Sequence, residues 1–314
     1  MTLSHAYKNI SRFRKRYGII TGVRAIIHYC FVAIRKSKLE SKNYVIKVND
    51  TQLEVIPGDL GTSLELLLFK THEPISTQIV KETLQKGMIC LDIGANIGYY
   101  VTLESKVIGD HGKIIAVEPS PLNFEFLKRN MERQSTKNIQ VFNFAAGDKT
   151  GQINFVMDEN ESNSGRVISD DEVSKWSGQV SRLPVKTIDS FLEEIKIDKI
   201  DFLRMDVEGY EYHIFQGMKN TIKKSKPIIQ IEVHKSIMGI KTTKKWLNEL
   251  KNEGYELKSY IPRELDAPLI GTINDIKRYS LDELISMLDE QLLPSFFMLC
   301  LVNINKEQTH TPSF

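Results

Sequence analysis

The sequence of 314 residues has few cysteines and no apolar run long enough to cross a bilayer. Its three cysteines, Cys30, Cys90 and Cys300, show no metal-ligand spacing, and the last two lie in apolar runs where cysteine usually packs as a small hydrophobe. We therefore expect no disulfide framework and a reducing, cytoplasmic compartment. The apolar stretch 19–34 has sixteen residues, whereas a membrane-spanning helix needs about 20. Basic residues follow it in place of a cleavage site, so a secretory signal is not indicated.

The chain also lacks a strong net charge, at +2, but the balance is uneven along its length. Residues 1–43 carry ten lysines and arginines and one acid, and the remainder carries 32 basic and 39 acidic side chains. A mildly acidic body argues against an extended nucleic-acid interface. We predict no nucleic-acid partner.

The basic leader, residues 1–42, is predicted to contain an amphipathic helix. Thr21, Arg24 and His28 are spaced so that a helix would carry one narrow polar stripe on a mostly apolar cylinder. Such a helix, with cations on both sides, suits contact with an anionic membrane through residues 8–38, at the inner face of the membrane. Packing on the body of the protein, or on a second copy in a homodimer, is the other interpretation. The sequence leaves both open.

The segment after the leader predicts a hairpin followed by a helix. Alternating apolar residues in 43–56 meet across an Asn49-Asp50 turn, and a helix over about 75–85 is closed by Gly87. We therefore divide the chain into the N-terminal segment 1–42, a hairpin-and-helix unit 43–86, and a main domain 87–314.

From residue 87 onward, strand-like and helix-like segments alternate, which predicts an α/β fold with a mostly parallel sheet covered by helices on both faces. Two late strands without a crossover helix between adjacent parallel positions predict an antiparallel last strand. Residues 262–294 are predicted to be a polar, helical insertion that forms a wall of the site. The stretch 157–180 is predicted to be a long loop, either a cover for the binding pocket or a disordered connection. The expected parallel strands cover 88–93, 113–119, 139–146, 200–207 and 227–234. A single helix over about 211–224 is expected between the last two of them.

A turn rich in glycine follows the first of these strands, in LDIGANIGYY at 91–100. In an open parallel sheet, ligands bind beyond the carboxyl ends of the strands, and glycines there allow close approach or a sharp turn. The spacing is not the G-x-G-x-x-G of a dinucleotide site, because Asn96 replaces the middle glycine between Gly94 and Gly98. The preceding Asp92 would repel a pyrophosphate and suits a ligand with an ammonium or sulphonium group.

Two more acids follow the next two strands. Glu118 comes 26 residues after Asp92, where a carboxylate can accept both hydroxyls of a ribose, and Asp148 follows the third strand, where an adenine edge would lie. A glycine turn alone is a weak signal. All three features at successive strand ends indicate S-adenosylmethionine.

At these motifs the chain resembles the FkbM-type family of S-adenosylmethionine-dependent methyltransferases. The resemblance runs from about residue 43 to 234, and its most specific parts are the D-x-G-A-N-x-G turn and D-V-E-G-x-E. The matching stretches are LDIGANIGYY (91–100), GKIIAVEPSPLNFEFLKRN (112–130), FAAGDKTG (144–151), VKTIDSFL (185–192), DFLRMDVEGYEYHIFQG (201–217) and IIQIEVH (228–234).

This resemblance implies a Rossmann-like class I methyltransferase fold and S-adenosylmethionine as cofactor. It suggests that the acceptor is a hydroxyl on a sugar, a glycolipid or a secondary metabolite. The cofactor-binding residues that it implies are Asp92, Gly94, Ala95, Asn96, Gly98, Glu118, Pro119, Ser120, Ala146, Asp148 and Asp206.

Candidate catalytic residues end the fourth and fifth strands. Methyl transfer to oxygen requires alignment of the acceptor with the methyl group and removal of a proton. Asp206 and Glu208 would share a side if their strand continued, and His234 titrates near neutrality and suits a base, with Glu232 in a position to orient it. Glu211, in a first helical turn, is interpreted equally well as a helix-dipole partner. The remaining histidines have no motif context and are interpreted as surface or packing residues.

Asp206, Glu208 and His234 also form an oxygen and nitrogen set, yet no ligand spacing demands a metal, and we predict none. Two other classes of function compete with methyl transfer. A nicotinamide-dependent oxidoreductase is disfavoured by the missing glycine and by the lack of a Tyr-x-x-x-Lys pair. A non-catalytic, membrane-associated binding protein that retains the fold is disfavoured by the intact acids and glycines of the motifs.

Overall fold

The structure, a computed structural model, describes residues 16–35, 44–134, 136–158, 161–176 and 178–305. Its centre is a seven-stranded sheet in the order β5-β4-β3-β10-β11-β13-β12. Neighbouring strands from β5 to β11 are parallel, whereas β13 is antiparallel to both β11 and β12. The predicted parallel sheet with an antiparallel last strand is therefore confirmed. The strands are β3 (Ile89–Ile93), β4 (Lys113–Val117), β5 (Ile139–Phe142), β10 (Phe202–Met205), β11 (Ile228–His234), β12 (Tyr255–Pro262) and β13 (Phe296–Asn303).

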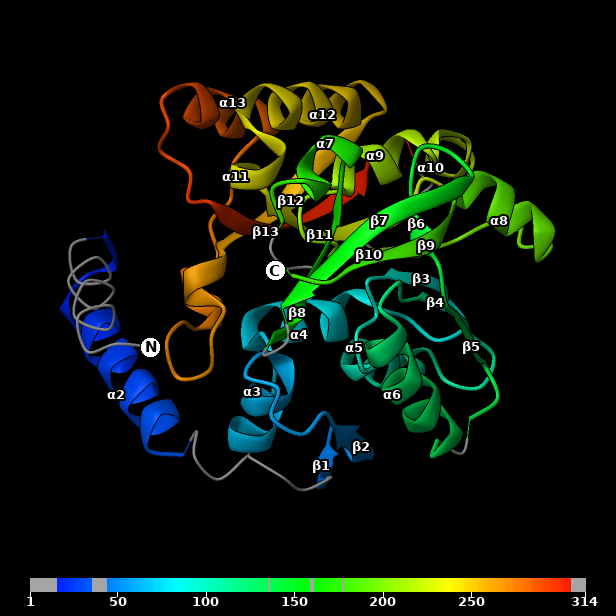
Figure 1. The fold of residues 1–314 in the computed structure, drawn as a ribbon. Helices are drawn as coiled ribbons and strands as arrows, with labels where there is room; N and C mark the ends of the chain where they lie inside the picture. The colour runs from blue at the N-terminus through cyan, green and yellow to red at the C-terminus, as the bar shows by residue number, and fades with distance from the viewer. Residues whose placement is uncertain (1–15, 36–43, 135, 159–160, 177, 306–314) are drawn as a thin grey trace.

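Helices cover both faces of this sheet, as Figure 1 shows. The two faces have separate cores because side chains alternate along each strand: Leu91 and Ile93 of β3 pack on one side, and Cys90 packs on the other. On the first face lie α8 (Ile188–Glu194), α9 (Glu211–Gln216), α10 (Lys219–Ser225), α12 (Ile240–Asn252) and α13 (Leu281–Asp289). On the second lie α4 (Pro74–Thr83), α5 (Tyr99–Ile108) and α6 (Pro121–Glu132).

The predicted hairpin is present as β1 (Tyr44–Val48) and β2 (Thr51–Val55), which pair antiparallel. Asn49 and Asp50 both have positive φ, at 50° and 60°, as a tight two-residue hairpin turn requires. The hairpin and the helix α3 (Thr62–Phe69) share the core of the second face with α4 and α5. The segment 44–86 is thus packed against the sheet.

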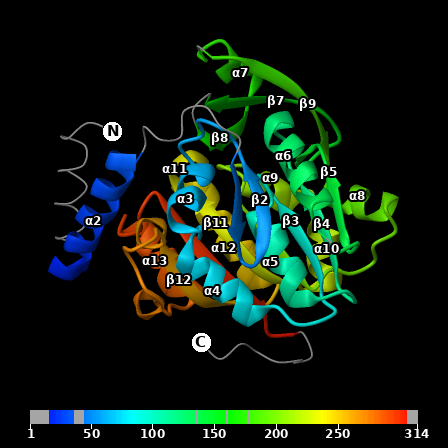
Figure 2. The ribbon, with the colours of Figure 1, turned by 90° about the horizontal axis from the view of Figure 1, so that it is seen from below.

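The expectation of a long loop at 157–180 is wrong. Residues 157–158, 161–168 and 180 of this stretch belong to a second, four-stranded sheet in the order β6-β9-β7-β8, which lies at one end of the molecule in Figure 2. The prediction failed because the stretch is polar and shows no apolar alternation. The elements are β6 (Ala145–Ala146), β7 (Gly151–Asp158), β8 (Glu161–Ile168), α7 (Asp170–Val173) and β9 (Val180–Lys186).

Two helical predictions also need correction. The single helix expected over 211–224 is divided into α9 and α10 at Gly217, where a Cβ atom would lie 1.9 Å from the carbonyl oxygen of Gly147. The insertion 262–294 is helical only in α13, and short 3-10 turns occupy its first half. The connecting elements are α11 (Lys235–Met238), η2 (Arg263–Leu265) and η3 (Ile273–Asp275).

The leader helix is α2 (Ile19–Arg35), which lies at the edge of the molecule beside the segment that contains η2 (Figures 1 and 2). The other residues of the predicted membrane-contact segment, 8–15 and 36–38, lie outside the described residues. Over the part of the chain that the structure covers, no helix combines the length and apolarity needed to cross a membrane.

Candidate active site

A cavity of about 350 Å³ opens beyond the carboxyl ends of β3, β4, β10 and β11, where the sequence predicts the ligand site. Many predicted residues line it, and four do not: Asp92, Gly98, Ser120 and Asp148. The predicted residues on the wall are Gly94, Ala95, Asn96, Glu118, Pro119, Ala146, Asp206, Glu208, Glu232 and His234.

The glycine turn after β3 is shaped by packing as much as by ligand access. Gly94 has a φ of +86°, and a Cβ atom there would lie 1.9 Å from the backbone oxygen of Asp206. Gly98 has a φ of +92° and touches the side chains of α6. Asn96 adopts φ of +50°, a left-handed conformation that asparagine tolerates better than most residues. Asn96 therefore has a left-handed backbone conformation at the position where the dinucleotide motif has its middle glycine.

Glu118, at the end of β4, has the geometry of a ribose acceptor. Its two carboxylate oxygens accept hydrogen bonds from the backbone N–H groups of Asn96 (2.8 Å) and Ser120 (2.9 Å). The side chain of Asn123 also hydrogen-bonds this carboxylate, and the side chain of Glu118 lines the cavity although the residue is only 4% exposed. Burial raises the pKa of Glu118 to about 7, against the opposing effect of these hydrogen bonds. Ser120, which does not line the cavity, thus helps to hold Glu118.

Asp92 lies beneath Arg204 in a buried ion-pair network. Arg204 lines the cavity, lies 3.3 Å from Asp92 and 3.2 Å from Asp206, and stacks 3.8 Å from the ring centre of Tyr100. Glu73 lies 3.7 Å from the same guanidinium and accepts a hydrogen bond from Tyr100 at 2.8 Å. Burial raises the pKa of Asp92, and Arg204 opposes that shift. Asp92 therefore acts on the cavity through Arg204, and its direct contact with a cofactor stays a prediction.

His234, the last residue of β11, is held between two carboxylates. Its Nδ1 contacts Oε1 of Glu211, which is fully buried, and its Nε2 lies 3.1 Å from Oε2 of Glu208. Burial would lower the pKa of His234, but the charges of Glu211 and Glu232 and the hydrogen bonds of Glu208 and Glu211 raise it well above 6.5. The neighbouring carboxylates therefore favour the protonated imidazole, which can donate to both Glu208 and Glu211.

Glu208 reaches His234 because β10 ends at Met205. The backbone of Glu208 has a left-handed φ of 53°, which is uncommon for a side chain of this kind. The strand therefore does not continue to Glu208, and the condition under which Asp206 and Glu208 would share a side is not met, although both residues line the cavity. Burial raises the pKa of Glu208, and His234 opposes that shift.

Glu232 contacts Arg263 and not His234, so the predicted orienting role falls to Glu211. Arg263 Nε lies 3.4 Å from Glu232, and Arg263 Nη2 lies 3.1 Å from Glu73. Burial, with the negative charge of Asp206, raises the pKa of Glu232 to about 8, against the effect of Arg263.

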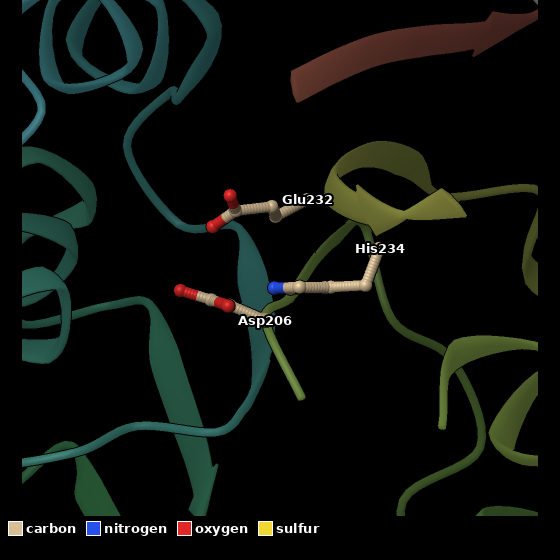
Figure 3. A group of neighbouring side chains, drawn as sticks. All are labelled: Asp206, Glu232 and His234. Atoms are coloured by element: carbon tan, nitrogen blue, oxygen red, sulfur yellow. The ribbon is translucent and has the colours of Figure 1, made fainter. Parts of the chain in front are cut away.

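Asp206, Glu232 and His234 converge on one side of the cavity, as Figure 3 shows. One oxygen or nitrogen atom from each lies within 4.8 Å of the others, a spacing compatible with a metal ion. Each of these residues, however, already has a partner of opposite charge: Arg204 for Asp206, Arg263 for Glu232, and Glu208 for His234. The prediction that no metal is required therefore stands as a prediction.

Asp148 lies away from the cavity wall. Its Oδ2 is 2.9 Å from Nδ1 of His213 on the surface, so its assignment to the adenine remains a prediction that the geometry does not support. Among the lining residues that the sequence did not single out, four have acidic or basic side chains: His72, Glu73, Arg204 and Arg263. Arg204 carried a signal, because a charge inside an apolar strand must be paired when buried.

The order of the central sheet, with its reversed seventh strand, and the acid at the end of β4 define a class I S-adenosylmethionine-dependent methyltransferase. The residues present fit this cofactor. Glu118 presents a carboxylate to the cavity that can accept hydrogen bonds from hydroxyl groups, and apolar side chains of Ile97, Val117 and Ala146 line the wall around it. Residues 92–257 match the model of the methyltransferase FkbM domain, and the chain belongs to that family.

The curated relatives are distantly related to this chain, and each similarity covers only part of the two sequences. The chain is 24% identical over 176 residues to the hexuronic acid methyltransferase AglP of Haloferax volcanii, covering 55% of this chain and 67% of AglP. It is 24% identical over 168 residues to the 2-O-methyltransferase NoeI of Sinorhizobium fredii, covering 48% of this chain and 66% of NoeI. A solved FkbM methyltransferase from Methylobacillus flagellatus is 21% identical, with a TM-score of 0.35 over 48% of this chain and 33% of that one. Membership of the family sets aside the nicotinamide alternative.

Proposed function

We propose that the enzyme transfers a methyl group to a hydroxyl oxygen of a sugar, free or carried on a lipid or secondary metabolite. The observation that carries this proposal is the pair formed by Glu208 and His234 on the cavity wall, with buried Glu211 behind it. A hydroxyl must lose its proton as its oxygen attacks a methyl group, and a positioned acid–base pair accepts that proton. Bound S-adenosylmethionine supplies the electrophilic methyl on a cationic sulfur.

In this mechanism the acceptor hydroxyl would donate a hydrogen bond to Glu208, and its proton would pass to the Glu208–His234 pair. The methyl group would move from sulfur to the acceptor oxygen, with S-adenosylhomocysteine as the leaving group. Glu211 fixes the orientation of the imidazole and balances its charge. Because the two groups are coupled, the proton and the apparent pKa belong to the pair. Asp206 and Glu232 lie beside them and can accept hydrogen bonds from neighbouring sugar hydroxyls.

A neutral acceptor fits this cavity better than an acidic one. Among the described residues that line it, each cationic side chain already faces an acid: His72 with Glu65, Arg204 with Asp92, Arg263 with Glu73, and His234 with Glu211. A sugar carboxylate would therefore meet no unpaired cation and several carboxylates, and its desolvation would be poorly offset. Similarity to NoeI, named as a 2-O-methyltransferase, supports transfer to a hydroxyl.

The test is incubation with methyl-labelled S-adenosylmethionine and separated fractions of lipids, glycans and small molecules. We expect the label in a neutral carbohydrate fraction, and we expect it to resist alkaline hydrolysis, because a methyl ether is stable where a methyl ester is cleaved. A His234→Asn variant should bind S-adenosylhomocysteine normally and transfer no label. Label released by alkali as methanol would show transfer to a carboxyl group and would refute the proposal.

A further inference from the structure

The leader helix α2 packs on the rest of the protein through its polar side, the opposite of what is usual for a surface helix. The polar stripe predicted from the sequence faces the protein: Thr21 is buried, and His28 Nδ1 lies 2.8 Å from the backbone oxygen of Pro268. Between them, Ala25 is fully buried against Leu265 and Ile270. A surface helix normally turns its polar side outward. Here the side that remains outside is the apolar one.

That outer face is a continuous aliphatic row. Its members follow a helical spacing and are each between 40% and 73% exposed: Ile19, Ile20, Val23, Ile26 and Ile27. Single exposed apolar residues are ordinary, but a contiguous row on one face indicates a surface that is covered in the working protein. We call these five residues the outer row.

The charge around the helix points to what covers it. Cations stand in the sequence on both sides of α2, with Arg12, Arg14 and Lys15 before it and Lys36 and Lys38 after it, and residues 1–43 contain one acid. An apolar row with cations at both ends complements a surface whose interior is hydrocarbon and whose border is anionic. A second copy of this chain is a poorer fit, because pairing two such helices in either direction brings clusters of like charge together.

We propose that α2 docks the protein on an anionic lipid surface, with the outer row inserted at the boundary between head groups and acyl chains. The helix lies flat, because its 17 residues are too few to span a bilayer. Binding combines burial of the aliphatic side chains with attraction between the flanking cations and the head groups.

Short elements connect the docked helix to the cavity. Leu265 of η2 packs on Ala25, and Arg263, two residues earlier in the same turn, lines the cavity beside Glu232. At the other end of the contact, Phe69 of α3 lies against the ring of His28, and Thr62, at the start of α3, also lines the cavity. A lipid surface at the outer row would thus lie near the acceptor side of the site. The further step, that the acceptor sugar is attached to a lipid, rests on the proposed function.

The experiment is co-sedimentation of the full chain with phosphatidylcholine vesicles, with and without phosphatidylglycerol. We expect binding to the anionic vesicles, weakening as salt rises, and little binding to the neutral ones. Replacing two members of the outer row, in an Ile20→Asp, Ile27→Asp double variant, should lower the partition coefficient at least about tenfold, because two apolar side chains no longer insert. Leu122→Asp, a change at a similarly exposed leucine on α6, is the matched control and should bind like the parent.

Binding of S-adenosylhomocysteine by calorimetry confirms that each variant is folded, and it does not depend on the lipid. Equal sedimentation of the double variant and the parent would overturn the proposal. So would a dimer in light scattering, in the absence of vesicles, that the double variant abolishes, because the outer row would then be a subunit interface. Failure of methyl transfer to sugars would refute the proposed function and leave the vesicle result unchanged.

Discussion

Replacement of Glu118 tests the cofactor site most directly. In the bound state we expect its two oxygens to accept hydrogen bonds from two ribose hydroxyls. A hydrogen bond to a charged group contributes about 1.5–3 kcal/mol, so Glu118→Ala should lose about 3–6 kcal/mol of binding free energy. That loss corresponds to a rise of roughly 10²- to 10⁴-fold in Kd for S-adenosylmethionine. Glu118→Gln keeps one acceptor oxygen and should cost about 10- to 100-fold.

The pH dependence gives an independent check on the same residue. The pKa of Glu118 is raised to about 7, so the carboxylate is the better acceptor only above that value. We expect cofactor affinity to increase as pH rises from 6 to 8, by up to about tenfold per unit below the pKa. The stability contribution of this group runs in the opposite direction. Between its unfolded pKa near 4.5 and about 7 the folded state binds more protons, so the free energy of unfolding falls as pH rises through that window.

The assay is isothermal titration calorimetry of parent and variants at several pH values, with thermal unfolding as a check on folding. That check matters because alanine leaves the N–H groups of Asn96 and Ser120 without their acceptor. Glu193→Ala, a change at an exposed acid on α8, serves as the control and should bind like the parent. If Glu118→Gln binds as tightly as the parent and shows the same pH dependence, the assignment of Glu118 to the ribose is wrong.

Three further predictions follow from the site. Glu211→Gln removes the buried charge that raises the pKa of His234. We therefore expect kcat to fall about 10- to 100-fold and the pH–rate profile to shift to lower pH. An unshifted profile would contradict the positioning role of Glu211. Gly94→Ala should lower the free energy of unfolding by about 2–5 kcal/mol, because the new methyl meets Asp206 at a left-handed φ, and a melting temperature equal to the parent's would contradict that packing. Chelation with EDTA should leave activity unchanged, since Asp206, Glu232 and His234 are already paired; a loss reversed by Mg²⁺ or Mn²⁺ would assign them to a metal.

The core of the fold could be predicted from the sequence because its signals are local. Apolar runs such as 88–93 and 227–234 mark strands buried on both faces, and the turn at Asn49 and Asp50 marks the hairpin. The second sheet could not be predicted in this way. Its strand β8 is mostly polar. The sheet is stabilised by pairing between β7 and residues up to 34 positions away, from Gly151 to Val185, which no local pattern reveals.

The residues of the candidate site also fall into two groups: those that local sequence signals identify, and those that reach the site only through tertiary packing. Glu118 and His234 were identified because they follow strands, and strand ends meet at one edge of a parallel sheet. Glu73 and Arg263 were missed because they come from outside the parallel strands and reach the cavity only through tertiary packing. Glu211 looked like a helix-dipole partner, and only its contact with His234 gives it a role in the site.

The close fit of Gly94 against the backbone of Asp206 has a consequence for how acceptor preference can change. That contact couples the glycine turn after β3 to the backbone that follows β10, so neither segment can change its path without disturbing the other. The freedom to suit a different acceptor is therefore left to the walls contributed by Phe155 and Val167 of the small sheet, and to the turn at Arg263 after β12. A new acceptor specificity would arise through substitutions in those walls, while the contact between Gly94 and Asp206 stays unchanged.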